Sequence, residues 1–334
     1  MKKMLMLFAG IMLLLALSAC GQKSQSDVVS ELNEKLGEMK GYKANAKMTL
    51  KMGTEPQVYN VEIWHKDPSF YRVNLKNEEK DQSQMILKND DGVYVLTPAL
   101  NKSFKFQSEW PENSSQAYLF ESLVKDITED KSATYKETDK HYVFETKTRY
   151  QNNKMLPYQE ITINKKDLSP VSVKVMDPDK TALVLVEFSK VKFDTTFDKD
   201  SFDMKKNMTS AQLEAPVMAE VQNEGFAVKY PENIGDMNLT EEKEITTEKG
   251  ERVVLTYEGT KSFTLVQEKA EVVQTSVSTN VNGEPVDLGY TVGAMTGNTI
   301  AWTFEGVDYM LASKDLTQAE MIEVARSVGE DPVK

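Results

Sequence analysis

The chain has 334 residues, of which 40% are hydrophobic and 28% are charged, so it can bury a sizeable core and is not a wholly disordered protein. Its length fits one large domain or two ordinary domains. The 52 acidic and 40 basic residues give a net charge of -12, which argues against binding to nucleic acid or to an anionic membrane surface, because both require a basic field. We therefore expect no nucleic-acid partner.

The N-terminus has the pattern of a secretory signal peptide, because Lys2 and Lys3 precede an apolar run over residues 4–17. The sequence Leu-Ser-Ala-Cys then ends at Cys20, the single cysteine of the chain. This ending resembles the lipobox of bacterial lipoprotein signals. The resemblance implies cleavage after Ala19 and a diacylglyceryl group on the thiol of Cys20. The alternative, a signal anchor, is disfavoured because a bilayer-spanning helix needs about 20 apolar residues.

Two acyl chains on one cysteine are sufficient for stable anchoring, whereas a single chain holds a protein only weakly. We therefore expect a signal peptide over residues 1–19 and a lipidated tether over residues 20–26. The expected location is the outer face of the cell membrane in a Gram-positive type of envelope, with the lipid anchor, for example palmitate, as the contact to the membrane.

Residues 27–39 are predicted to form an amphipathic helix, with Ser26 as its N-cap and Gly41 just beyond its end. Its apolar residues recur at helical spacing, at Val28, Leu32, Leu36 and Met39. A second helix is predicted over residues 115–128, where Leu119, Leu123 and Ile127 form one stripe.

The remaining pattern up to residue 193 alternates apolar with polar residues, as half-buried antiparallel strands do. We predict strands at residues 48–52, 58–64, 71–75, 85–87, 93–96, 104–106, 142–144, 161–163, 171–175, 183–188 and 191–193. An open sheet of more than about ten strands curls, so these strands should form one curved sheet. The expected fold is mostly β (α+β): a curved antiparallel half-barrel wrapped over two helices.

Several motifs in series carry a resemblance to a known family. Lys-Asp-Pro-Ser-Phe-Tyr-Arg (66–72) precedes Asn-Asp-Asp-Gly-Val-Tyr-Val-Leu-Thr-Pro-Ala-Leu-Asn (89–101), and Leu-Ser-Pro (168–170) follows. Over residues 27–206 the chain resembles the LolA/LolB/RseB-like lipoprotein superfamily, and most closely the sporulation-associated LolA-like lipoproteins of the YdcC kind. This resemblance implies a half-open β-barrel that holds acyl chains in a hydrophobic cavity. The family's carriers are often freely soluble, whereas an anchored protein does not shuttle.

A polar stretch at residues 207–222 is predicted to be a linker to a smaller α+β domain at residues 223–330. Strands are predicted at residues 253–257, 263–266, 272–277 and 300–304. The last helix should begin with the capping box Thr-Gln-Ala-Glu (317–320) and end at Gly329. This part resembles a small domain of unknown function found at the C-terminus of sporulation lipoproteins, a resemblance that implies architecture but no chemistry.

If the half-barrel is concave, one alternating set of side chains on its strands faces inward and forms the walls of a trough. The candidate ligand-binding residues are Met48, Leu50, Met52, Val61, Ile63, Val73, Leu75, Met85, Ile161, Ile163, Val173 and Val175.

Catalysis is not expected, because the two histidines, His65 and His141, accompany no nucleophile motif and no metalloprotease motif. Both histidines are predicted to have structural roles at strand ends. The Asp177-Pro-Asp179 segment lacks the third oxygen position and the glycine of a calcium loop and reads as a turn. We expect no cofactor and no metal ion.

Three functions remain open at this point. The chain could bind lipid, acyl chains or a lipoprotein in the trough and support the envelope during sporulation. It could instead be an RseB-like sensor or scaffold that acts through a membrane-protein partner. In the third alternative it is a structural lipoprotein whose own side chains fill the trough.

Overall fold

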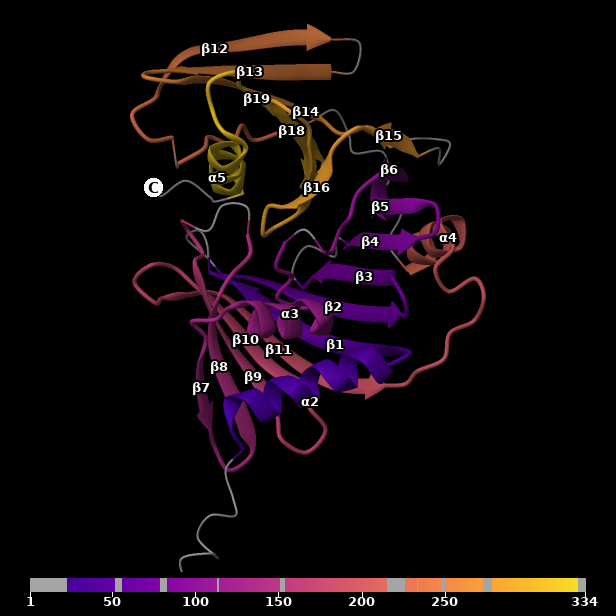
Figure 1. The fold of residues 1–334 in the computed structure, drawn as a ribbon. Helices are drawn as coiled ribbons and strands as arrows, with labels where there is room; N and C mark the ends of the chain where they lie inside the picture. The colour runs from indigo at the N-terminus through magenta and orange to yellow at the C-terminus, as the bar shows by residue number, and fades with distance from the viewer. Residues whose placement is uncertain are drawn as a thin grey trace, which may run out of the picture.

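The computed structural model describes residues 23–51, 56–78, 83–112, 114–150, 154–214, 226–232, 234–247, 250–272 and 278–329. The signal peptide, Cys20 and Met52 lie outside these described residues. Two β-sheets make up most of the described chain, and Figure 1 shows the smaller sheet above one end of the larger, curved sheet. No helix among the described residues has the length and apolar character needed to cross a membrane.

The larger sheet has twelve strands in the order β15-β6-β5-β4-β3-β2-β1-β11-β10-β9-β8-β7. Its strands are β1 (Gly41–Leu50), β2 (Gln57–Lys66), β3 (Phe70–Asn77), β4 (Ser83–Asn89), β5 (Gly92–Thr97), β6 (Lys102–Phe106), β7 (Thr134–Glu137), β8 (His141–Lys147), β9 (Tyr158–Asn164), β10 (Pro170–Met176), β11 (Ala182–Phe193) and β15 (Thr279–Val281). All neighbouring pairs are antiparallel except β15 with β6, which is parallel. The predicted curved antiparallel sheet is therefore confirmed.

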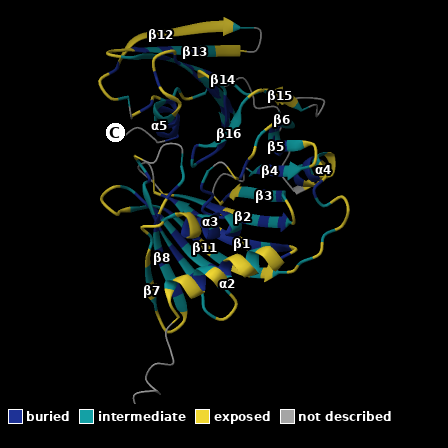
Figure 2. Ribbon diagram, in the orientation of Figure 1, coloured by how far each residue is buried: buried dark blue, intermediate teal, exposed yellow. Residues whose placement is uncertain are grey.

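Helices α2 (Gln25–Glu38) and α3 (Phe120–Glu129) lie across the concave face of this sheet (Figure 1). The N-cap of α2 is Ser24, two residues before the predicted Ser26, because Ser24 and Asp27 form a reciprocal capping box. Both helices are amphipathic, and Figure 2 shows α2 largely exposed on its outer side. Their apolar residues enter the same core as the inward residues of the strands.

A third helix, α4 (Met204–Glu214), occupies part of the stretch in which the sequence predicts a linker. It packs with Met208 and Ala211 against the convex face of β4 and β5, next to Phe202. The apolar stripe of α4 is narrow and polar residues surround it, so the sequence pattern reads as a polar segment. The half-barrel is therefore covered by helices on both faces, rather than by two helices on its concave face alone.

The smaller sheet has seven antiparallel strands in the order β12-β13-β14-β19-β18-β17-β16. Its strands are β12 (Asn238–Thr247), β13 (Gly250–Glu258), β14 (Ser262–Lys269), β16 (Glu284–Asp287), β17 (Val292–Met295), β18 (Thr299–Phe304) and β19 (Val307–Ala312). Helix α5 (Gln318–Val328) packs on it, and the predicted capping box of Thr317 and Glu320 is present. The smaller α+β fold is confirmed, although most of the predicted strand at residues 272–277 lies outside the described residues.

The two sheets are joined by strand pairing as well as by side chains. Strand β15 comes from the sequence region assigned to the second domain, yet it pairs with the edge strand β6 of the larger sheet. The boundaries at residues 206 and 223 therefore stay a prediction, and the junction between the sheets is a structured part of the molecule.

Candidate ligand-binding site

Ten of the twelve predicted trough residues lie together in one apolar cluster on the concave face. They are Met48, Leu50, Val61, Ile63, Val73, Leu75, Ile161, Ile163, Val173 and Val175. Met52 lies outside the described residues. The period-two pattern thus predicted the direction of these side chains.

Met85 lies on the opposite, convex face of the sheet, in the cluster formed with α4. In β4 it is Ile86 that joins the concave core, whereas Met85 and Leu87 point the other way. All three residues are buried, because α4 covers one face of this strand and the core that includes Trp110 and Val292 covers the other. When a strand is apolar on both faces, its apolar and polar residues do not alternate. The sequence then does not show which residues face the concave core.

The concave face is filled by the protein's own side chains. Ile63, Ile161 and Val173 are 0% exposed, and they share a core with Leu32 of α2 and Leu123 of α3. Most of the predicted trough is therefore closed in this structure.

Helix α3 is fixed in place by a buried polar network. Asp126, on α3, pairs with Arg149 and accepts hydrogen bonds from Ser115 Oγ at 2.9 Å and Gln159 Nε2 at 2.6 Å. Removing one partner of such a network leaves a buried group unpaired, which is strongly destabilising. The network holds α3 against the sheet and keeps the concave face closed.

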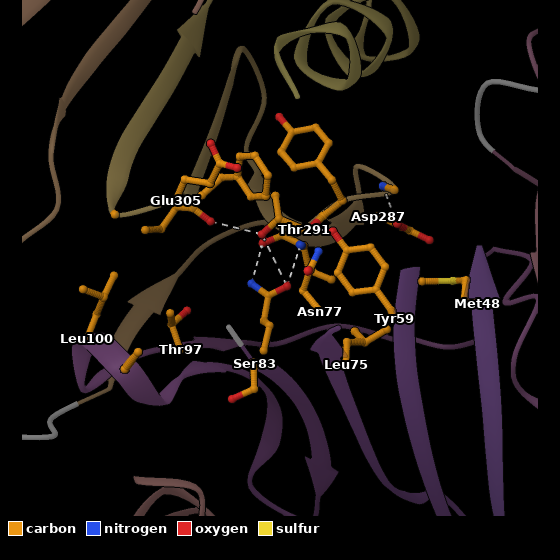
Figure 3. Close-up of a pocket in the computed structure, with 18 of the residues that line it drawn as sticks. Met48, Tyr59, Leu75, Asn77, Ser83, Thr97, Leu100, Asp287, Thr291 and Glu305 are labelled. Atoms are coloured by element: carbon orange, nitrogen blue, oxygen red, sulfur yellow. Dashed lines mark hydrogen bonds between the residues drawn. The ribbon is translucent and has the colours of Figure 1, made fainter. Parts of the chain in front are cut away.

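An unfilled cavity of about 70 Å³ lies at the junction of the two sheets (Figure 3). We call it the seam cavity. Its apolar walls are Met48, Leu75, Leu100, Tyr118, Val292 and Phe304. Asn77, Asp287 and Thr291 add polar groups to its lining (Figure 3). Apolar walls with a few placed polar groups are typical of ligand sites.

Hydrogen bonds across the junction hold the seam cavity open between the sheets. The side chain of Gln84 accepts from Val292 N at 2.7 Å and donates to Val292 O at 3.2 Å. The hydroxyl of Tyr59 donates to Tyr290 O at 3.0 Å. Burial raises the pKa of Tyr59 to about 12, so the hydroxyl keeps its proton at neutral pH. An ion pair between Lys102 and Asp308 adds a further link at 2.5 Å.

A second cavity, of about 190 Å³, shares Tyr118, Asp287 and Val292 with the seam cavity. We call it the arginine cavity. Its walls include Ile86, Trp110, Tyr150, Val286, Ile322 and Arg326. Because of the shared walls, the two cavities lie next to each other along one junction.

Comparison with known proteins identifies the family. Residues 1–202 match the family described as "Sporulation protein YdcC-like". The chain is 58% identical over 328 residues to the sporulation protein YdcC of Bacillus subtilis (strain 168), covering 98% of this chain and 97% of that protein. The chain belongs to the YdcC-like family. The family expected from the sequence motifs is confirmed.

Solved structures similar to this YdcC-like protein have low sequence identity to it. MucB, known from a structure of the Pseudomonas aeruginosa MucA/MucB complex, is 12% identical with a TM-score of 0.33, over 90% of this chain and 97% of that chain. A putative outer membrane lipoprotein-sorting protein domain from Vibrio parahaemolyticus is also 12% identical, with a TM-score of 0.34, over 55% of this chain and 99% of that chain.

The two histidines of this YdcC-like protein lie in different environments. His141 begins β8, as the sequence predicts. His65 is buried in β2, where its ring lies 4.5 Å from that of Tyr71. Within the part of the chain that the structure describes, no group of three or more His, Cys, Asp or Glu residues could hold a metal ion.

The partner of His65 is Glu121 on α3, which the sequence patterns do not indicate. His65 Nε2 lies 3.1 Å from Glu121 Oε1, and His65 Nδ1 lies 3.2 Å from the carbonyl oxygen of Phe70. Burial raises the pKa of Glu121 to about 8 and lowers the pKa of His65 to about 4. At neutral pH a protonated carboxyl group therefore faces a neutral imidazole. Only the fold brings these residues together, so no local sequence signal could have paired them.

We expect the Glu121→Gln variant to match the wild type in stability at about pH 5 and to exceed it at about pH 9. The raised pKa keeps Glu121 protonated in the folded protein, whereas the unfolded chain ionises above the ordinary value of 4.5. The wild type therefore loses stability as the pH rises from 4.5 to about 8. Glutamine cannot ionise, so the variant's advantage should reach on the order of 3 kcal/mol.

Urea unfolding at several pH values measures this difference. The lowered pKa of His65 costs stability as the pH falls from 6.5 towards 4, in both proteins, so it cancels in the comparison. Glu145→Gln, which changes an exposed ion pair with Lys180, is the control and should follow the wild type. Parallel curves for Glu121→Gln and wild type would contradict the assignment of a protonated Glu121.

Proposed function

We propose that this protein is a lipid-anchored envelope protein that binds an acyl chain of a lipid or lipoprotein at the junction of its two sheets. The observation that carries the proposal is the seam cavity, which stays open and apolar although the concave face is filled. Adjacent to it, the arginine cavity extends the same junction. The site is therefore shifted from the trough that the sequence pattern indicates to the edge of that trough.

The anchor in this proposal is the diacylated Cys20, with cleavage after Ala19 and a location on the outer face of the cell membrane. The sequence Leu-Ser-Ala-Cys and the preceding apolar run support it. A role in sporulation is supported by the name of the Bacillus subtilis relative and by the family's description.

We propose a binding role rather than catalysis. His65 is buried, and the lowered pKa keeps it neutral between Glu121 and the Phe70 carbonyl, away from the seam cavity. The polar groups at the seam cavity are held in position by the protein's own hydrogen bonds: Thr291 Oγ1 donates to Thr303 O at 3.1 Å, and Asp287 accepts from Gly289 N at 2.7 Å.

A tryptophan at Ala99 should block binding of a fluorescent fatty acid such as cis-parinaric acid. Ala99 lines the seam cavity, and an indole ring there would occupy the space of a ligand. We expect at least a tenfold loss of affinity, about 1.4 kcal/mol, in a fluorescence titration. The matched control is Ala182→Trp in β11, a half-buried alanine that lines neither cavity.

Unchanged affinity of Ala99→Trp, with a thermal midpoint like that of wild type, would contradict binding at the seam. If the wild-type protein bound no fatty acid at all, a scaffold function would be favoured instead. One observation supports that second function: β12 is an edge strand, exposed over nearly its whole length (Figure 2). Among the described residues no strand pairs with its outer side, which a strand of a partner protein could therefore join.

A further inference from the structure

Arg326 is a buried arginine in the last turn of α5, with 8% of its surface exposed. Its Nη2 donates to the backbone oxygen of Asp287 at 2.9 Å. Among the described residues, its Nε and Nη1 have no hydrogen-bond acceptor. A guanidinium group has five N–H donors, of which one is on Nε and two are on Nη1. Three donors of a buried cation therefore have no acceptor in the part of the chain that the structure describes.

The other arginines of the chain are all paired with carboxylates. Arg72 lies 2.5 Å from Glu62, Arg252 lies 2.6 Å from Glu268, and Arg149 pairs with Asp126. Among the described residues, Arg326 has no carboxylate oxygen within 4.0 Å. A buried charge without a counterion is costly, so Arg326 is suited to binding an anionic partner.

The described groups around Arg326 leave its charge without an ion-pair partner. Arg326 forms part of the wall of the arginine cavity, which is otherwise largely apolar and aromatic. Two carboxylates, Glu284 and Asp287, also line the cavity, but each has another partner: Glu284 accepts from Ser108, and Asp287 accepts from Gly289 N. The central carbon of the guanidinium group lies 6.0 Å from the centre of the Tyr150 ring. Neither carboxylate lies within 4.0 Å of the guanidinium group, so neither forms an ion pair with Arg326.

We propose that the arginine cavity binds the oxyanion head of a single-chain amphiphile. The oxyanion, a carboxylate or a phosphate, accepts charge-assisted hydrogen bonds from Arg326. The apolar chain then passes the shared wall at Tyr118 and Val292 towards the seam cavity. This inference rests on the proposed function and adds to it the charge of the ligand and the residue that recognises it.

Isothermal titration with ten-carbon probes tests the inference on the mature chain, residues 20–334, carrying Cys20→Ser so that it needs no detergent. The probes are decanoate, decyl phosphate and the uncharged decanol. We expect the anionic probes to bind at least tenfold more tightly than decanol, and the tighter of the two identifies the source of the oxyanion. Arg326→Met should reduce their affinity to that of decanol, which should itself bind the variant as it binds wild type.

Two further variants serve as a control and as an independent test. Arg252→Met removes an arginine already paired with Glu268 and should leave all affinities unchanged. Asp287→Asn removes a negative charge from the cavity wall and should strengthen decanoate binding several-fold, whether or not Arg326→Met folds.

Equal binding of decanoate and decanol, unaffected by Arg326→Met, would overturn the head-group inference and leave the proposed function standing. Weaker decanoate binding by Asp287→Asn would also overturn it. Absence of binding by every probe would contradict both the inference and the proposed function.

Discussion

Replacing Ile161 with glutamate should destabilise the protein by about 4 kcal/mol or more, enough to unfold much of the population. Ile161 is 0% exposed and faces the core that β9 shares with α2 and α3. A carboxylate there has no cationic partner and no access to water. In an open, water-filled trough the same change would cost far less, so this variant distinguishes a filled concave face from an empty one.

Two matched variants serve as controls. The free energy of unfolding in urea and the thermal midpoint are measured for all three variants. Thr162→Glu, the next residue of β9, points to the opposite, half-exposed face and should lose about 1 kcal/mol or less. Leu75→Glu lies at the seam cavity and is half-buried, so it should cost less than Ile161→Glu while weakening fatty-acid binding. Wild-type stability of Ile161→Glu would contradict a filled concave face.

Replacing Cys20 with serine should abolish the lipid anchor. A serine hydroxyl does not take the diacylglyceryl group, so the variant should lack the added lipid mass and the cleavage after Ala19. Intact-mass measurements detect the missing lipid and the missing cleavage, and membrane fractionation detects the loss of anchoring. We expect nearly complete loss of the lipidated form. Without two acyl chains, stable anchoring is lost.

The control for Cys20→Ser is Ser24→Ala, which changes the N-cap of α2 and leaves the lipobox intact. This control should stay lipidated and anchored. If Cys20→Ser had the mass of the wild type and fractionated as tightly with membranes, the proposed anchor would be disproved.

Local patterns were enough to predict the half-barrel and its inward side chains. Ile161 and Val173 alternate with polar residues on strands that are covered by helices on one face only, so their direction follows from the period. The pattern failed for Met85, because α4 covers the second face of β4, and α4 itself has too narrow an apolar stripe to be recognised.

The junction of the sheets could not be predicted from sequence. Gln84 and Val292, whose hydrogen bonds hold the seam together, are 208 residues apart, and no local signal links them. Glu121 and Arg326 lie in amphipathic helices, where a charged residue is ordinarily solvent-exposed. Only the packing of α3 and α5 shows that Arg326 is buried and that Glu121 is mostly so.

Photolabelling tests most directly that the ligand lies at the seam between the sheets. A ten-carbon fatty acid with a diazirine at its chain end is bound to the mature chain and irradiated, and the labelled peptides are identified by mass spectrometry. We predict labels on the segments that carry Leu75, Leu100 and Phe304, which line the seam cavity. Labels on Leu32 of α2 and Leu123 of α3, with none at the seam, would show that the chain enters the concave face and would contradict the account.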